Sequence, residues 1–185
     1  MHRRQLLSSI ALLFAGCSSS GQSKSTGTPV ELPENDYTGM YEYSDKLLLN
    51  QKDLGGKWQG GQISKRQSEF SYTQSEADYF QTFELRSSIW IFDTIQGAKD
   101  QYDKSPVVPG EPKINKFNAG DEAFWFRPRE ISIEVTIREQ NMLGYLTYIR
   151  DFEQKPGVQN PSGATPKPQW KEAKLYIKAF MTDWY

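Results

Sequence analysis

The sequence predicts an α+β fold, with an antiparallel sheet of about five or six strands and two or three helices packed mainly on one face. Three observations predict it. Residues 131–137 alternate strictly between apolar and polar side chains, as in a strand with one buried face. Residues 143–149 follow after a short polar turn, which favours an antiparallel hairpin. Over residues 169–184, apolar side chains recur at steps of three and four, which is typical of an amphipathic helix.

Shorter elements are expected before this hairpin. Residues 79–92 predict a strand, and its final run Ile-Trp-Ile-Phe is typical of a central strand covered on both faces. Asp93 or Thr94 is expected to cap a helix that continues to about Lys104. Short strands are expected at residues 113–117 and 123–126.

The first part of the domain carries weaker signals. Ser44 and Asp45 are expected to cap a short helix over residues 46–52, before a Gly-Gly pair that suits a helix stop. Residues 62–78 are rich in Ser, Gln and Glu, and they predict either a long exposed hairpin or an irregular excursion. Residues 154–168 predict a long surface loop, since they are rich in Pro and Gly.

Length and charge limit the classes of protein. The chain has 185 residues, which suits one domain, and 14% of them are aromatic, which supplies a core despite a low apolar fraction. Its 22 basic and 23 acidic residues exclude a strongly basic nucleic-acid-binding protein. We therefore expect no nucleic-acid partner.

Residues 1–16 predict a signal peptide. Arg3 and Arg4 form a basic start, and an apolar run from Leu6 to Gly16 follows, which is shorter than a spanning helix. The two arginines also suit a twin-arginine export signal, although the general secretory route stays open. The alternatives are a plain signal peptide followed by an incidental Cys, or a buried N-terminal helix.

Cys17 is the predicted lipidation site. Small residues precede it, in the order Leu-Phe-Ala-Gly-Cys, and residues 17–36 continue as a tether rich in Ser, Gly and Thr. A lipid on Cys17 would hold residues 37–185, the predicted globular domain, at the outer face of the cell membrane. Loss of residues 1–16 would leave an excess of acidic residues, so attachment would depend on the acyl chains.

Much catalytic chemistry is excluded by the placement of two residues. His2 and Cys17 are the only His and Cys, so residues 18–185 contain neither Ser-His-Asp nor Cys-His catalysis, disulfides or ordinary zinc sites. No phosphate-binding or dinucleotide-binding glycine motif is present, and no segment has calcium-loop spacing. We predict no cofactor and no metal.

The candidate ligand contacts are few. Arg127 and Arg129 flank a proline near a strand end and suit either an anionic ligand or a solvated rim. Tyr41 and Tyr43 are candidates for stacking on sugar rings, as are Tyr37, Trp184 and Tyr185, because all five lie near segment ends. The alternative is that these aromatic residues close the sheet edges and pack the terminal helix. Trp58, Trp90 and Trp125 are expected in the core.

Asp121 and Glu122 are adjacent acidic residues. Along a strand they would point to opposite faces, so we expect a turn there rather than an acid–base pair.

Two segments carry a resemblance to known proteins. Leu54-Gly55-Gly56-Lys57-Trp58 and Gly120-Asp121-Glu122-Ala123-Phe124 resemble steps in small prokaryotic (including archaeal) membrane lipoproteins and extracytoplasmic sensor-like domains. Over residues 45–185 the order of elements is also similar to photosystem extrinsic-protein-like domains. The resemblance implies a binding or accessory lipoprotein whose partner is an envelope protein or a small ligand, and it carries no catalytic residue.

Two function classes therefore stay open. The first is a non-enzymatic binding module anchored outside the cell. The alternative is a carboxylate-based hydrolase, or a sugar-binding protein, that acts on cell-surface polysaccharide. A hydrolase would need two carboxylates about 5–9.5 Å apart in an aromatic cleft.

Overall fold

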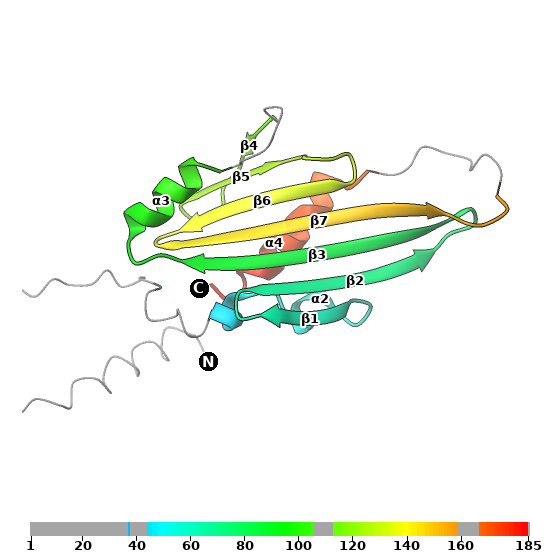
Figure 1. Ribbon diagram of the computed structural model, residues 1–185, viewed down its shortest axis with the longest axis horizontal. Helices are drawn as coiled ribbons and strands as arrows, with labels where there is room; N and C mark the ends of the chain where they lie inside the picture. The colour runs from blue at the N-terminus through cyan, green and yellow to red at the C-terminus, as the bar shows by residue number, and fades with distance from the viewer. Residues whose placement is uncertain (1–36, 38–43, 106–112, 159–166, 185) are drawn as a thin grey trace, which may run out of the picture. The chain divides into compact units, whose positions relative to one another are not determined.

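Seven antiparallel strands form one sheet, in the order β1-β2-β3-β7-β6-β5-β4 (Figure 1). The computed structural model describes residues 37, 44–105, 113–158 and 167–184, and all of them belong to one compact unit. Together with three helices in these residues, the sheet confirms the α+β class. The predicted number of strands, five or six, was too low.

The elements follow the chain in a simple order. The strands are β1 (Gln59–Ser64), β2 (Gln67–Ser75), β3 (Tyr79–Ile91), β4 (Asn115–Lys116), β5 (Glu122–Phe126), β6 (Ser132–Glu139) and β7 (Met142–Gln154). The helices are α2 (Gln51–Leu54), α3 (Ile95–Asp103) and α4 (Trp170–Met181).

Strands β3 and β7 form the centre of the sheet. They pair without interruption from Tyr79 opposite Gln154 to Ile91 opposite Met142. Strand β7 therefore continues beyond the predicted end at residue 149, because β3 offers hydrogen-bonding partners along its whole length. The predicted hairpin is confirmed as β6 and β7.

The polar segment after Trp58 forms the β1–β2 hairpin, so the irregular alternative for residues 62–78 was wrong. Only alternate residues of β2 meet the core: Phe70 is buried and Tyr72 packs against Phe83. Position 60 requires glycine, because its φ is 134° and a Cβ there would overlap the backbone of β2. These two strands account for most of the difference in strand number.

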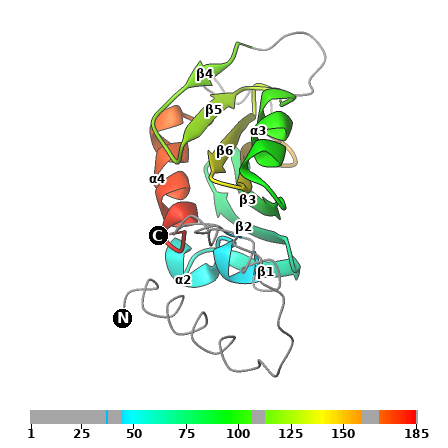
Figure 2. The ribbon, with the colours of Figure 1, turned by 90° about the vertical axis from the view of Figure 1, so that its left-hand side faces the viewer.

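One side of the sheet, here called the covered face, carries Leu85, Ile89 and Val135 and packs against α4 (Figure 2). From the helix, Ala173, Ile177 and Phe180 enter this core. Buried aliphatic and aromatic side chains contribute roughly 1.5–3 kcal/mol each, so this face supplies most of the stability.

The other side, here called the second face, carries Glu69, Arg86 and Trp90. Helix α3 covers only part of it, where Tyr102 packs against Phe124, Phe126 and Leu143 in a smaller core. Figure 2 shows α3 and α4 on opposite sides of the sheet. The expected packing of helices mainly on one face therefore holds for α2 and α4 but not for α3.

The helix ends are fixed by side chains. Of the two predicted caps, Asp93 and Thr94, it is Thr94 that caps α3, with its hydroxyl accepting from the Gly97 amide. Gln169 and Glu172 form a capping box at the start of α4. Near residue 50 the prediction was wrong: residues 44–47 form a 3-10 turn, and Asn50 caps the short helix α2 instead of Ser44 or Asp45.

The end of the described chain returns to its beginning. The Tyr37 hydroxyl donates to the Trp184 carbonyl at 2.8 Å, and the Tyr37 amide donates to Asn141 Oδ1 at 2.9 Å. The Trp184 indole donates to the Leu47 carbonyl. Its ring lies against Gly144 in β7, where any Cβ would overlap it.

Candidate functional site

A hollow of about 270 Å³ opens on the second face, beside the part that α3 covers. Its floor is made by β2, β3 and β7, and the tip of β1 borders it. The lining residues are mostly small or hydrogen-bonding: Ile63, Gln67, Ser68, Glu69, Arg86, Ser87, Ser88, Tyr145 and Thr147. None of these residues belongs to a predicted site.

Strand alternation explains why the hollow is polar. In β2, Phe70 turns to the covered face and Glu69 to the second face; in β3, Leu85 and Arg86 divide in the same way. Glu69, Arg86 and Thr147 then lie side by side across three strands. No helix covers this stretch, so the sequence supplies water-compatible side chains there.

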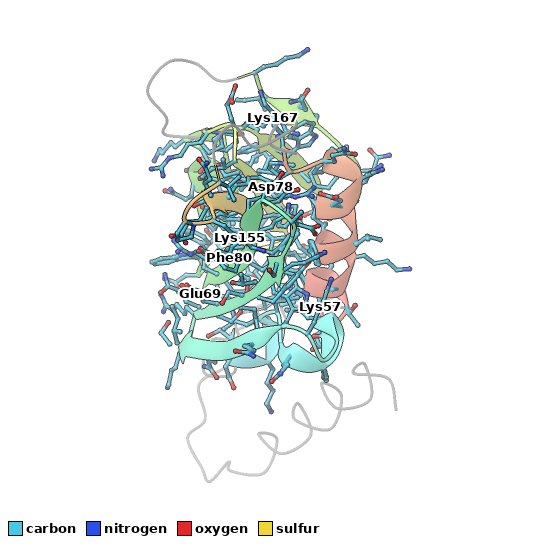
Figure 3. The ribbon with its side chains drawn as sticks, turned by 90° about the vertical axis from the view of Figure 1, so that its right-hand side faces the viewer. Lys57, Glu69, Asp78, Phe80, Lys155 and Lys167 are labelled. Carbon is cyan, nitrogen blue, oxygen red and sulfur yellow. The ribbon has the colours of Figure 1, made fainter. Side chains whose placement is uncertain are left out.

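Arg86 is held by two carboxylates. Its Nε lies 3.4 Å from Glu69 Oε2, and its Nη2 lies 2.9 Å from Glu84 Oε2. Figure 3 shows Glu69 on the side of the sheet away from α4. The two acids orient the guanidinium and exceed its single positive charge, so the hollow has no excess of positive charge for a strongly anionic ligand.

Tyr145 links the hollow to α3. Its ring is half-buried, and its hydroxyl lies near the side chains of Ser105 and Gln101. Burial raises the pKa of the Tyr145 hydroxyl, so the group stays neutral at physiological pH. It is therefore an uncharged polar group at the border of the hollow.

Trp90 lies two residues beyond Ser88 on the same strand, about 7 Å away on the same face. Its side chain is 44% exposed, so the prediction that Trp90 belongs to the core was wrong. The Arg66 guanidinium lies 5.3 Å from the ring centroid. The apolar run Ile-Trp-Ile-Phe does mark a central strand, but only one of its two faces is covered at this position.

The site therefore combines an aromatic surface with uncharged and charge-balanced hydrogen-bonding groups. Hydroxyls come from Ser88 and Thr147, an amide from Gln67 and a carboxylate from Glu69. Such a set recognises a ligand that carries both hydroxyl groups and an apolar surface. Neither the aromatic surface nor the polar lining carries a sequence motif.

Arg127 and Arg129, the predicted ligand contacts, have partners on different faces of the sheet. Arg127 stacks 6.0 Å from the Trp125 ring centroid and donates from Nη2 to the Pro168 carbonyl at 2.5 Å. Its Nη1 is buried without a hydrogen-bond partner among the described residues. Arg129 is exposed and interacts electrostatically with Glu134, which belongs to the second face. The structure therefore does not join them into one fork.

Asp121 and Glu122 converge on Arg138, although we expected them to diverge. Arg138 lies 2.8 Å from Asp121 Oδ2 and 2.7 Å from Glu122 Oε2, and its side chain is only 10% exposed. Asp121 lies in the turn before β5, so strand alternation does not apply to it. The Arg138 hydrogen bond lowers the pKa of Glu122, which keeps that carboxyl ionised.

The other predicted residues divide into two groups. Tyr41, Tyr43, Tyr185, Arg3, Arg4 and Cys17 lie outside the described residues. Trp58 is buried as expected, and Tyr37 and Trp184 are also buried, which removes both as exposed stacking surfaces. Trp125 is half-buried and stacks on Trp170 with centroids 4.6 Å apart.

The described part of the chain lacks two further features. It contains no group of three or more His, Cys, Asp or Glu side chains placed to hold a metal ion. No helix within it has both the length and the apolar character needed to cross a membrane. No known family, curated protein or solved structure matches the chain.

Proposed function

We propose that this chain is a non-enzymatic binding module, anchored by a lipid on Cys17 at the outer face of the cell membrane, and that it binds its ligand in the hollow of the second face. The hollow carries the proposal, because an open sheet surface and an oriented Arg86 meet there, and the exposed Trp90 follows two residues after Ser88 on the same face of β3. The basic start, apolar run, Cys17 and Ser-rich tether support the anchoring.

The second candidate function is more specific: the chain is a sugar-binding protein whose ligand is a sugar ring of a cell-surface polysaccharide. Trp90 supports it, since an exposed aromatic ring beside hydroxyl, amide and carboxylate groups can stack on a pyranose while its hydroxyls are hydrogen-bonded. Arg86 and its two carboxylate partners have a net negative charge, which favours a neutral sugar over a phosphorylated one.

Binding is better supported than hydrolysis. A glycosidase of the two-carboxylate type needs one carboxyl group protonated. Asp121 and Glu122 are both bound to the permanently charged Arg138, and the pKa of Glu122 is lowered. These two carboxylates suit a structural ion pair rather than acid catalysis.

Thermal unfolding of the detergent-solubilised full chain tests the proposal, with oligosaccharides, peptides, lipids and metal ions as the panel. A ligand at 100 times its Kd adds about 2.7 kcal/mol, which raises the Tm by several degrees. We expect a saturable shift with an oligosaccharide.

A matched pair of variants locates the binding. Arg86→Gln should abolish the shift, whereas Arg129→Gln makes the same chemical change outside the hollow and should preserve it. An equal shift in both variants would place binding elsewhere, and no shift with any compound in the panel would contradict a binding function for these ligand classes.

A further inference from the structure

The outer side of α4 carries three lysines and an exposed leucine. Lys171, Lys174 and Lys178 follow each other at helical steps of three and four, and all are exposed. Leu175 lies among them and is 67% exposed, the largest exposed fraction of any described large hydrophobic residue. The opposite side of the helix is buried in the covered face.

The acidic residues of this region have partners of their own. Glu172 accepts hydrogen bonds from the Tyr148 hydroxyl at 3.3 Å and from Arg150 at 3.4 Å, on the inner side of the helix. Asp183, beyond the end of α4, lies 3.7 Å from Lys52. Within the described part of the chain, no carboxylate is within ion-pair distance of Lys171, Lys174 or Lys178, so their positive charge is not neutralised locally.

The first described residue of the domain contacts the chain just after the end of α4. Tyr37 contacts Trp184, three residues after the end of α4. Residues 17–36 precede Tyr37 in the sequence, so the proposed anchor on Cys17 joins the domain through the residue that contacts this helix end. An anchor on Cys17 therefore keeps α4 within reach of the membrane surface.

We infer that the outer side of α4 docks on the anionic lipid surface, with Lys171, Lys174 and Lys178 against the headgroups and Leu175 at the interface. This rests on the proposed lipid anchoring. Glu69, which lines the hollow, lies on the side of the sheet away from α4 (Figure 3), so docking would present the hollow away from the membrane. Each lysine near an anionic surface contributes about five-fold in affinity, so three favour the docked state about 100-fold.

Site-specific fluorescence tests the docking on the full-length lipoprotein as the cell processes it, reconstituted in vesicles. With Cys17 acylated, a cysteine introduced at Leu175→Cys is the free thiol for an environment-sensitive fluorophore. Glu153→Cys places the same fluorophore on the second face as the matched control. Vesicles contain either phosphatidylcholine alone or phosphatidylcholine with phosphatidylglycerol, together with headgroup-quencher lipids.

We expect quenching at position 175 only with phosphatidylglycerol present, and its loss in about 1 M salt, where the screening length is about 3 Å. The triple variant Lys171→Glu, Lys174→Glu, Lys178→Glu should lose the quenching. The triple variant Lys104→Glu, Lys113→Glu, Lys116→Glu changes the charge equally outside α4 and should keep it. Circular dichroism checks that both variants remain folded.

The possible outcomes distinguish failure of the docking of α4 from failure of the lipid anchor on which the docking rests. Vesicles that retain the protein but quench neither position overturn the docking and leave the anchor intact. Protein that does not stay with vesicles of either composition overturns the anchor itself. Quenching that is equal at positions 175 and 153, or independent of phosphatidylglycerol, also overturns the docking. Protection of position 175 by an acidic protein in place of lipid would assign the lysines to a protein partner.

Discussion

The two faces of one sheet are built from the same strands and yet serve different purposes. On the covered face, α4 and the segment around Leu47 bury a continuous apolar core. On the second face, α3 covers a smaller core, and the rest is polar and hollowed. Alternation along each strand therefore determines which face a residue occupies, whereas the helices determine which face is shielded from water.

The largest expected effect contrasts adjacent residues of β3. Ile89 is fully buried on the covered face, so Ile89→Ala should lower the free energy of unfolding by about 2–5 kcal/mol. Trp90→Ala, on the second face, should cost under about 1 kcal/mol but weaken ligand binding. Urea denaturation measures both. A similar loss of stability in the two variants would show that the second face is also a dry core.

Two glycines give a second contrast. Gly144→Ala should destabilise the protein by about 1–3 kcal/mol, because the added methyl group would overlap the Trp184 ring. The matched control is Gly61→Ala in β1, where a Cβ meets nothing within 4 Å, and its effect should stay within about 0.5 kcal/mol. Thermal unfolding compares the two; a neutral Gly144→Ala variant would mean that Trp184 can move without cost.

The Arg138→Gln variant tests the ion pairs that Arg138 forms with Asp121 and Glu122 on the second face. We expect a loss of about 1–2 kcal/mol at neutral pH, smaller than for a fully buried pair because Asp121 and Glu122 remain about a third exposed.

The pH dependence of this ion pair follows from the lowered pKa of Glu122, whose hydrogen bond with Arg138 is the main cause. Its contribution is fully present above the unfolded value of 4.5 and is lost as the pH falls through the lower folded pKa. Denaturation across acidic pH should therefore show a smaller difference between wild type and Arg138→Gln at low pH. A constant difference would contradict the ionic explanation.

Glu134→Gln should give the smallest effect, a gain of about 0.5 kcal/mol at neutral pH. Burial raises the pKa of Glu134, and Arg129 opposes this only in part, so the ionised carboxylate is unfavourable in the folded state. Here the sign is opposite to that of Glu122: the gain should decrease as the pH falls through the raised folded pKa and disappear below the unfolded value of 4.5. Stability curves at both pH values measure it, and a destabilised variant at neutral pH would assign Glu134 a favourable ionic contact.

Periodicity was sufficient to predict the elements that have one apolar face. The hairpin of β6 and β7, the strand β3 and the helices α3 and α4 all carry such a pattern. Strands β1 and β2 were left ambiguous, because their residues make only a few core contacts, such as that of Phe70. Their pairing depends on β3, and the local sequence pattern of β1 and β2 does not show this partner.

The candidate site could not be predicted in the same way. Arg86, Glu69 and Thr147 meet only because three strands align in one register. Trp90 is exposed because α3 covers the neighbouring strands and not the surface around Trp90. The apolar neighbours of Trp90 in the sequence had indicated a buried position. The common partner of Asp121 and Glu122 could not be predicted, because Arg138 comes close to them only through the pairing of β5 with β6.

The contacts of Tyr37 have a mechanical consequence. A pull on the chain N-terminal to Tyr37 enters the domain at its hydrogen bonds with Trp184 and Asn141. Asn141 donates in turn to the Phe92 carbonyl at the end of β3, so the load passes to the turn between β6 and β7 and to the central strands. Force that reaches Tyr37 is thus passed to the turn between β6 and β7 and to the end of β3 rather than to the edge strands β1 and β4.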